Sequence, residues 1–436
     1  MSTPAPVRAR DHERLRRAAA LLRDAERPVR VLRTLSWGPE VRARFFERGA
    51  RELPVPRYEP LDPTSTLAAV AEARRSIRTA DDPIDAWLQR QAEAIEAGAL
   101  MLASVGTDAF HAHSARLYGR PTDRLQDQSS TSLVMAKELD DVLSGLDHGF
   151  LGAPAPACHL ADDVATRIRS VVQRHLGDDA PDVSVVDDLS ANALAGPRSI
   201  RLRRGACFSD RDWHYLVQHE AFVHVVTSLN GRAQRDLPIL GAAHPGTTRT
   251  QEGLAVFAEF ITGAIDPARL RRLSDRVLAI QMSIDGADFL ELYRWFLERS
   301  QGEPDQAFEN ARRVMRGGVL TGGAPFTKDG VYLDGLLRVH NFLRSVVRQE
   351  RTDCLRLLFC GKLDIEDIPA LCHLAAEGLC RLPVHLPPWA ADLRFLVAYL
   401  AYSGFLNRVK LDTIQAHYTD LLNHTPLVST GASPCP

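Results

Sequence analysis

The sequence predicts a mainly α protein of the α+β class, in which a small β-sheet lies beside a central helix. Three observations support this fold class. Apolar residues recur at helical spacing along most of the 436 residues. Strand-like content, rich in β-branched residues, is confined to residues 182–186 and 199–203. No repeat of fixed period occurs, so a solenoid of stacked units is not indicated.

The first predicted region, residues 1–150, consists of helices. Residues 8–25 have leucine and alanine on one face and many arginines elsewhere, which is typical of an amphipathic surface helix. Pro39 fits the first position of the next helix, where the missing N–H of proline costs nothing. Residues 53–63 contain four prolines and are expected to form a loop or an extended crossing. The expected helices cover residues 8–25, 39–49, 64–79, 83–104, 107–117 and 130–144.

A stretch rich in glycine, proline and alanine, residues 149–158, is the best domain boundary in the first half of the chain. It introduces a second region, residues 151–265, which begins with an expected helix at 160–176 and continues with the two strands. One edge of these strands could hold an extended peptide by β-addition. The alternative is a hairpin that only covers the core.

The third region, residues 266–425, is again predicted to be helical. The Gly317-Gly318 and Gly322-Gly323 pairs flank a loop that leads into a helix from residue 329. The last segment, residues 426–436, is predicted to be disordered. The expected helices of this region cover residues 267–284, 289–299, 304–316, 329–348, 354–359, 365–377 and 390–403.

The net charge and the hydropathy of the chain argue against some classes of function. A formal net charge of −2 gives no general attraction to nucleic acid or to an anionic membrane. The sequence has no apolar run of about eighteen residues and no apolar leader segment, so a cytoplasmic protein is expected. Its seven cysteines are odd in number and lack C-x-x-C spacing, which favours free thiols in a reducing compartment.

The hexapeptide His219-Glu220-Ala221-Phe222-Val223-His224 is the main chemical signal in the sequence. Apolar residues recur at helical spacing over 213–229, which predicts a helix over about 210–230 that carries both histidines. A zinc peptidase helix uses two imidazoles as metal ligands and an adjacent glutamate as general base. A histidine on an apolar helix is more often a hydrogen-bonded core residue, so a third ligand is needed to distinguish the two interpretations.

The two histidines are five residues apart, whereas four is the usual spacing. On a regular α-helix, at about 100° per residue, they would lie about 140° apart, too far round to share one ion. One wide i→i+5 turn would bring them into line, and such π-bulges are concentrated at functional sites. The spacing therefore predicts a distorted helix between His219 and His224.

A carboxylate from the next helix is the expected third ligand, since zinc sites of this type leave the fourth position to water. Residues 250–260 are predicted to form that helix. Glu252 lies in its first turn, and Glu259 lies about two turns further along the same face. Spacing alone leaves both glutamates as candidates.

These motifs resemble those of a known family, the microtubule-associated tyrosine carboxypeptidases, whose bacterial members are catalogued as QEGLA-motif proteins. The resemblance is carried by His219-Glu220-x-x-x-His224 followed by Gln251-Glu252-Gly253-Leu254-Ala255. A third block, from Gly322-Gly323 through Phe326-Thr327-Lys328-Asp329 to Tyr332, is also similar to the family, although this chain has Pro325 within it.

The resemblance implies a helical metallopeptidase that binds Zn²⁺ through His219, His224 and Glu252, with Glu220 as the catalytic base. It also implies removal of a C-terminal aromatic residue, which is tyrosine in the characterised eukaryotic members. It does not imply tubulin as the substrate. The expected partner is the C-terminus of a peptide or protein, with no nucleic acid and no membrane, and no oligomeric state is predicted.

Hydrolysis needs further groups besides the metal and the base. A cationic or phenolic donor should stabilise the oxyanion, and Tyr332 and Lys328 are candidates because they lie four residues apart, which places them on one helical face if the helix begins that early. Asp329 is expected to orient one of them, to cap the helix or to line the substrate site. A carboxypeptidase also needs a fixed positive charge for the terminal carboxylate, for which Arg203, Arg338 and Lys328 are the candidates.

Two alternatives to a carboxypeptidase remain open from the sequence. An aminopeptidase or endopeptidase on the same scaffold would need an acidic anchor or an open cleft. A non-catalytic regulatory protein would hold a structural zinc through four protein ligands, or would have lost its zinc site.

Overall fold

The computed structural model describes residues 9–78, 81–146, 159–187, 189, 192–300, 302–406 and 418–419. It is mainly helical with two small sheets, which confirms the predicted fold class. The predicted boundary at 149–158 and the predicted tail at 426–436 lie outside the described residues. Within the described ranges, no helix combines the length and the apolar character that crossing a membrane requires.

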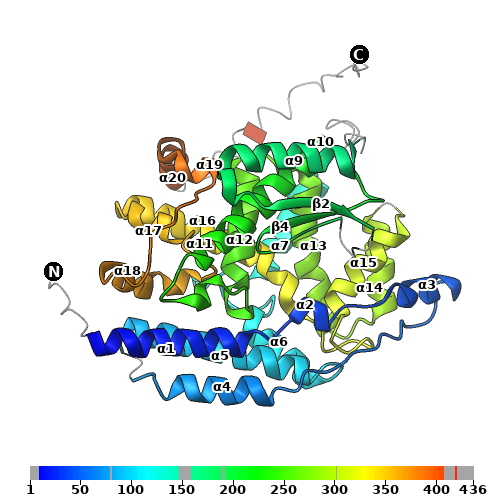
Figure 1. Cartoon of the computed structure of the whole chain (residues 1–436). Coiled ribbons are helices and arrows are strands. Elements are labelled where there is room, and N and C mark those ends of the chain that lie inside the picture. The colour runs from blue at the N-terminus through cyan, green and yellow to red at the C-terminus, as the bar shows by residue number, and fades with distance from the viewer. Residues whose placement is uncertain are drawn as a thin grey trace.

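Most helices that precede residue 147 lie together along one side of the molecule, where α1, α4 and α5 pack on one another and α6 packs on α5 (Figure 1). Helix α7 packs instead on α13. The predicted helices of this region are all present, each within five residues of its expected ends. Their bounds are α1 (Ala9–Glu26), α2 (Val31–Thr34), α3 (Pro39–Glu47), α4 (Thr64–Arg74), α5 (Pro83–Ala103), α6 (Asp108–Tyr118) and α7 (Ser132–Ser144).

A three-stranded sheet of order β2-β4-β3 follows helix α9. Strand β4 pairs in parallel with β2, because the segment between them turns back and adds β3 antiparallel to the other edge of β4. The alternative of a simple hairpin was therefore wrong, and β3 falls in a stretch expected to be loop. The bounds are β1 (His159–Leu160), α9 (Ala161–Leu176), η1 (Gly177–Asp179), β2 (Asp182–Val186), β3 (Ala193–Ala195), β4 (Ser199–Arg203) and β5 (Cys207–Phe208).

One continuous helical rod carries the two histidines of the hexapeptide. It begins at a capping box, in which the side chain of Ser209 accepts from the backbone of Asp212 and the side chain of Asp212 accepts in return. Strands β3 and β4 contact its middle segment, which confirms the predicted place of the sheet. The bounds are α10 (Asp210–Leu216), η2 (Val217–Val225) and α11 (Val226–Arg232), followed by η3 (Pro238–Gly241), η4 (Pro245–Thr247) and α12 (Thr248–Ile261).

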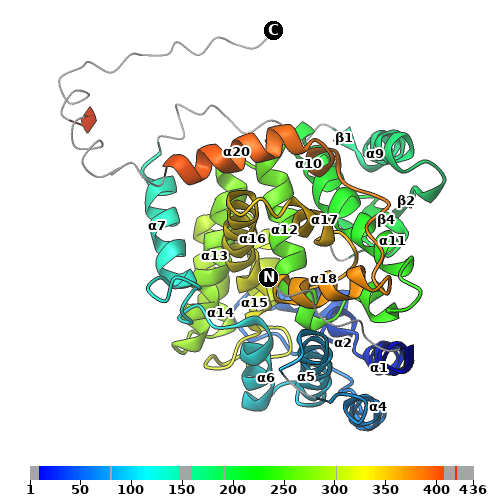
Figure 2. The ribbon, with the colours of Figure 1, turned by 90° about the vertical axis from the view of Figure 1, so that its left-hand side faces the viewer.

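Helix α12 runs through the middle of the molecule, between the histidine-bearing rod and α16, as both views show (Figures 1 and 2). The helix expected from residue 329 begins two residues later and is preceded by a 3-10 turn. The remaining elements are α13 (Pro267–Ile284), α14 (Phe289–Arg299), α15 (Pro304–Met315), η5 (Thr327–Gly330), α16 (Val331–Arg348), α17 (Thr352–Leu357), η6 (Ile365–Asp367), α18 (Ile368–Ala376), α19 (Pro388–Ala391) and α20 (Leu393–Leu406).

The main hydrophobic core is shared by all three regions that the sequence predicts. Trp87, Phe222 and Leu371 come from the first, second and third regions, and each is fully or almost fully buried in the same cluster. A smaller aromatic cluster, which includes Phe45 and Phe289, joins α3 to α14 and α15. The division into three regions stays a prediction, but their side chains pack against one another.

Helices α12 and α16 touch at two glycines, Gly253 and Gly335. A Cβ atom on Gly253 would overlap the backbone of Gly335, and a Cβ on Gly335 would overlap the carbonyl oxygen of Arg249. Backbone atoms cannot move aside as the end of a flexible side chain can. The close crossing of α12 and α16 therefore requires glycine at both positions. Because Glu252 precedes Gly253, the crossing also sets how far Glu252 lies from α16.

We expect Gly253→Ala to lower the free energy of unfolding by about 1–3 kcal/mol, because the added methyl group forces α12 away from α16. Gly404→Ala is the matched control: Gly404 lies in α20 with no atom near its would-be Cβ, and alanine is the better helix former there. Urea unfolding of both variants measures the effect. Equal stability of Gly253→Ala and the wild type would show that the crossing is not tight.

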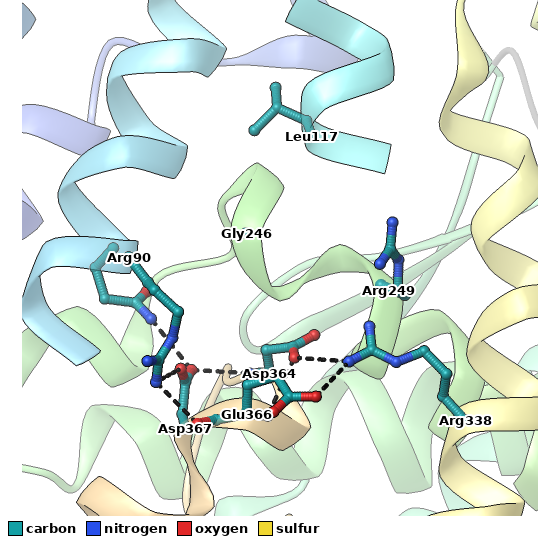
Figure 3. A pocket seen from close by; sticks show the side chains of 9 residues that line it. Arg90, Leu117, Gly246, Arg249, Arg338, Asp364, Glu366 and Asp367 are labelled. Carbon is teal, nitrogen blue, oxygen red and sulfur yellow. Dashed lines mark hydrogen bonds and ion pairs between the residues drawn. The ribbon is translucent and has the colours of Figure 1, made fainter. Parts of the chain in front are cut away.

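A polar pocket joins α5 to the segment around η6 (Figure 3). Arg90 Nη2 lies 3.2 Å from Asp367 Oδ1, and Gln91 Nε2 donates to Asp367 Oδ2 at 3.1 Å. The backbone N–H of Asp364 donates to Asp367 Oδ2 at 2.9 Å. Burial, reinforced by the Asp364 carboxylate, raises the pKa of Asp367 to about 7. Folding therefore favours the protonated form of this side chain.

We expect Asp367→Asn to change how stability depends on pH. Between pH 4 and pH 7 Asp367 binds a proton in the folded chain but not in the unfolded chain, whose aspartate pKa is about 3.9. The wild type therefore loses free energy of unfolding as pH rises through this window, by at most about 4 kcal/mol from this group. Asparagine does not titrate. Urea unfolding at pH 5 and pH 8 should show the variant gaining stability relative to the wild type, whereas Asp178→Asn, at an exposed site, should not. A constant difference between Asp367→Asn and the wild type would contradict the account.

Candidate metal centre

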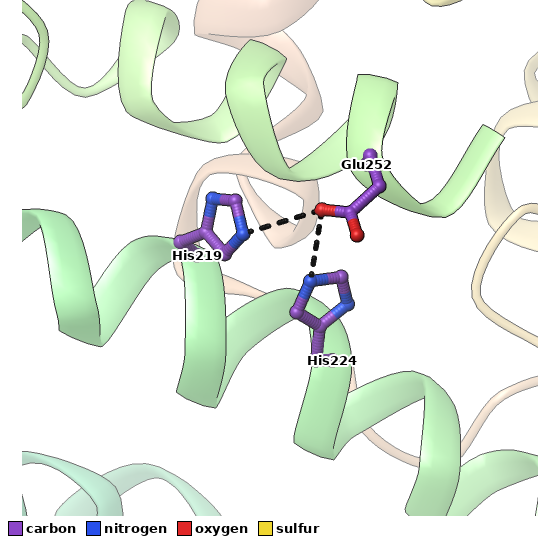
Figure 4. A group of neighbouring side chains, drawn as sticks. All are labelled: His219, His224 and Glu252. Atoms are coloured by element: carbon purple, nitrogen blue, oxygen red, sulfur yellow. Dashed lines mark ion pairs between the residues drawn. The ribbon is translucent and has the colours of Figure 1, made fainter. Parts of the chain in front are cut away.

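Three side chains from two adjacent helices converge on one point (Figure 4). His219 and His224 come from η2, and Glu252 comes from the first turns of α12. The Nε2 atoms of both histidines lie 3.6 Å from Glu252 Oε2, and the three candidate ligand atoms lie within 4.8 Å of one another. Two imidazoles and one carboxylate at this separation suit a divalent ion such as zinc, with a fourth position left for water.

The helix is wide where the histidines lie. Val217–Val225 is a π-helix of nine residues, set between the regular turns of α10 and α11. Its i→i+5 pairing places residues five apart on one side, so the ring centroids of His219 and His224 are only 4.9 Å apart. The predicted distortion is confirmed, and the spacing of the hexapeptide is explained by it.

Side chains stabilise the place where the π-helix returns to regular turns. The carbonyl oxygen of His224 accepts from Lys362 Nζ at 2.8 Å and from Ser228 Oγ at 2.7 Å. Lys362 also contacts Thr227 Oγ1 at 2.9 Å and Gln251 Oε1 at 3.1 Å. A buried carbonyl without a partner is costly, so these bonds support the irregular backbone. Burial lowers the pKa of Lys362 to about 7, although the Glu252 and Glu220 carboxylates oppose the shift.

Glu259 is a partner of His219 and does not face the other two ligands. Its Oε1 atom lies 2.7 Å from His219 Nδ1, and Arg269 holds its two oxygens at 2.9 and 3.0 Å. Burial would raise the pKa of Glu259, but Arg269 and His219 lower it to about 2. The ionised carboxylate fixes the His219 ring with Nε2 toward Glu252, as partners of metal-binding histidines do. Of the two glutamates that spacing allowed, the structure brings Glu252 to both Nε2 atoms.

The charge of Glu252 is set by its neighbours. Burial alone would raise its pKa, but Lys328 and the two imidazoles hold that pKa well below its ordinary value. The side chain is therefore an ionised carboxylate, the form that a metal ligand needs.

Glu220 is half-buried and follows His219 directly. Its carboxylate makes no hydrogen bond or ion pair with any described residue, yet it lies near enough to raise the pKa of His219 and to act on Lys362. A carboxylate that is beside a metal centre and otherwise unengaged is available to accept a proton.

Lys328 and Tyr332 lie together beside this centre, but not on one helical face, because Lys328 belongs to the 3-10 turn η5 and only Tyr332 to α16. Lys328 Nζ is 3.2 Å from Glu252 Oε1 and 5.4 Å from the centroid of the Tyr332 ring. Both side chains are mostly buried. The structure thus places a cation and a phenol next to the third candidate ligand.

Asp329 has a different position from the one expected of a substrate-binding residue. It is 1% exposed, and Arg313 grips both its oxygens at 2.6 and 3.0 Å. Burial would raise its pKa, but Arg313 and Arg276 lower it strongly. Asp329 therefore orients arginines and is not free to contact a substrate.

Arg203 and Arg338 have no contact with the three candidate ligands. Arg203, in β4, donates to Asn192 Oδ1 at 2.6 Å. Arg338 belongs to the polar pocket near η6, where its Nη2 atom lies 3.0 Å from Glu366 and 3.5 Å from Asp364 (Figure 3). Both arginines already have partners, so of the three candidates for a carboxylate-binding cation only Lys328 lies beside the three candidate ligands.

Sequence reasoning missed Lys362, and it missed Arg269 and Arg276 on α13. Two signals could have found them. Lysine is rare in this chain, so each lysine merits attention. Arg269 and Arg276 are seven residues apart, which places them on one face of α13.

The family model described as microtubule-associated tyrosine carboxypeptidase matches residues 43–408 of the chain. The match covers the candidate ligands, Glu220, Lys328, Tyr332 and the arginines of α13. No curated protein matches the chain.

We expect Glu259→Gln to weaken zinc binding about 10- to 100-fold, because a neutral amide orients His219 less firmly and makes it a poorer donor. Titration against a chromophoric chelator measures the affinity, and circular dichroism checks that the variant is folded. Glu298→Gln is the control, because this glutamate is exposed and its side chain has no partner among the described residues. Unchanged affinity in Glu259→Gln would rule out the orienting role.

Proposed function

The chain belongs to the microtubule-associated tyrosine carboxypeptidase family, and from this premise we propose that it is a zinc-dependent carboxypeptidase. It would remove a C-terminal residue, aromatic by analogy with the family name, from a peptide or protein. The convergence of His219, His224 and Glu252 beside an unengaged Glu220 is the observation that carries the proposal. The donor set suits zinc, and Glu259 provides the oriented histidine that such a site needs.

Zinc, when bound, would polarise the scissile carbonyl group and lower the pKa of a water molecule. Glu220 would accept a proton from that water and pass it to the leaving amine. The hydrogen bond from His219 to Glu259 would keep the imidazole in one tautomer throughout, because Arg269 holds the carboxylate ionised.

Lys328 and Tyr332 would stabilise negative charge on the carbonyl oxygen. Burial lowers the pKa of Lys328, but Tyr332 and Glu252 more than offset this, and the pKa is raised. The ammonium is therefore charged at neutral pH and acts as a donor, not as a base. Fixed donors aimed at developing charge in a buried site contribute strongly to catalysis.

The charges around the site favour a carboxypeptidase over the two alternatives. An aminopeptidase needs, besides the catalytic base, a free carboxylate for the substrate's amino group; with Glu220 assigned as the base, Glu259 and Asp329 are both occupied by arginine. A structural zinc site needs four protein ligands, and the group formed by the described residues contains three.

We expect Glu220→Gln to retain zinc and to lose turnover by a factor of about 10²–10⁴, because the amide cannot accept the proton. Elemental analysis measures zinc, and release of the terminal amino acid from N-acetylated peptides ending in tyrosine measures turnover. Glu298→Gln should keep both properties. A fully active Glu220→Gln would remove Glu220 from the mechanism.

The same assay with amidated peptides tests the direction of cleavage. A carboxypeptidase should release amino acid from the free acids and not from the amides. If blocking the C-terminus leaves cleavage unchanged, the proposed activity is wrong, whatever the role of zinc.

A further inference from the structure

Basic side chains gather around Tyr332, beside the metal centre. Lys328 Nζ lies 5.4 Å from the centroid of the Tyr332 ring and 3.2 Å from Glu252 Oε1. Arg276 Cζ lies 4.4 Å from the centroid of the same ring. The ring therefore links a second cation, Arg276 of α13, to the neighbourhood of the third candidate ligand.

These cations outnumber the carboxylates that pair with them. Arg276 and Arg313 share one partner, Asp329, and the buried Arg316 has no ion pair with any described residue. Burial lowers the pKa of Arg276 to about 10, and repulsion from Arg313 adds to the shift. A desolvated group of like charges is costly unless an anion joins it. The imbalance therefore favours an anionic ligand at this place.

The guanidinium of Arg276 has N–H groups that make no hydrogen bond with any described residue. Its Nη1 atom is buried and has no hydrogen-bond partner among the described residues, and its Nε atom lies 3.8 Å from Asp329 Oδ2, beyond hydrogen-bond range. Stacking on Tyr332 holds the guanidinium in place. A fixed, planar guanidinium with unused N–H groups is suited to gripping both oxygens of a carboxylate.

We propose that Arg276 binds the terminal carboxylate of the substrate. This inference rests on the proposed function, because a carboxypeptidase must hold that carboxylate about one residue, ~3.5 Å of chain, beyond the bond it cleaves. Arg203 and Arg338, the other arginines that the sequence suggested, are bound elsewhere. Arg276 thus sets the preference for a free C-terminus.

Helix α13 places Arg276 with respect to the metal ligands. Arg269 lies two turns earlier on the same face and is locked to Glu259, which holds His219. One rigid helix therefore carries both the residue that orients a ligand and the residue that binds the substrate. Arg272, between them, makes no hydrogen bond or ion pair with any described residue, and the charges that act most on it are those of Arg269, Asp266 and Asp212. It offers a matched control on the same helix.

The test measures binding to the zinc-loaded Glu220→Gln protein, which separates binding from turnover. The probes are an N-acetylated peptide ending in tyrosine, as the free acid and as the C-terminal amide, and calorimetry gives the affinities. We expect the free acid to bind at least 10-fold more tightly. Adding Arg276→Gln should weaken binding of the acid about 10- to 100-fold and leave the amide unchanged. Arg276→Lys should give an intermediate loss, and Arg272→Gln should give none.

The outcomes separate this inference from the proposed function. The inference is overturned if the parent protein does not distinguish acid from amide, if Arg276→Gln weakens both probes equally, or if Arg272→Gln has the same effect. If the wild type hydrolyses free-acid peptides and Arg276→Gln does so equally well, the activity stands and the assignment of Arg276 fails. If Arg276 governs binding of the acid but the wild type releases no amino acid, the carboxylate site stands and the proposed activity fails.

Discussion

Two imidazoles five residues apart can face one carboxylate only because the helix between them widens to i→i+5 pairing. On a regular helix they would point in different directions, and Glu252 would meet at most one of them. Two side chains secure the wide turn at the carbonyl oxygen of His224: Lys362, from a distant segment of the chain, and Ser228, from the next turn of the same rod. The candidate metal centre thus depends on a backbone irregularity that a distant segment of the chain stabilises.

Buried ion pairs hold the groups around this centre in position. Glu259 with Arg269 orients His219, and Asp329 with Arg313 lies beside Tyr332. Such pairs add little net stability, because desolvation opposes their attraction, but each leaves a costly unpaired charge if it is broken. Their value here is geometric: they keep several long side chains in single positions around the candidate metal centre. The close glycine crossing of α12 and α16 serves the same end at the level of the backbone.

Local sequence patterns were sufficient for much of this structure. Apolar periodicity, with proline and glycine at the ends, predicted the fold class and most helices. The spacing of His219 and His224 predicted the wide turn, because on a regular helix the two imidazoles would point too far apart to share one ion. Pairing across the chain was not predictable in this way. The parallel register of β2 with β4, the partners of Arg203 and Arg338, and the roles of Lys362 and Arg276 depend on segments that meet only after folding.

We propose that His219, His224 and Glu252 together hold one catalytic ion. An X-ray structure of the zinc-loaded protein, with anomalous scattering recorded at the zinc edge, tests it most directly. We expect one zinc per chain, bound by both Nε2 atoms and by the Glu252 carboxylate, with a solvent molecule as the fourth ligand. A peak elsewhere, a fourth ligand supplied by the protein, or a regular α-helix that turns the two imidazoles apart would contradict it.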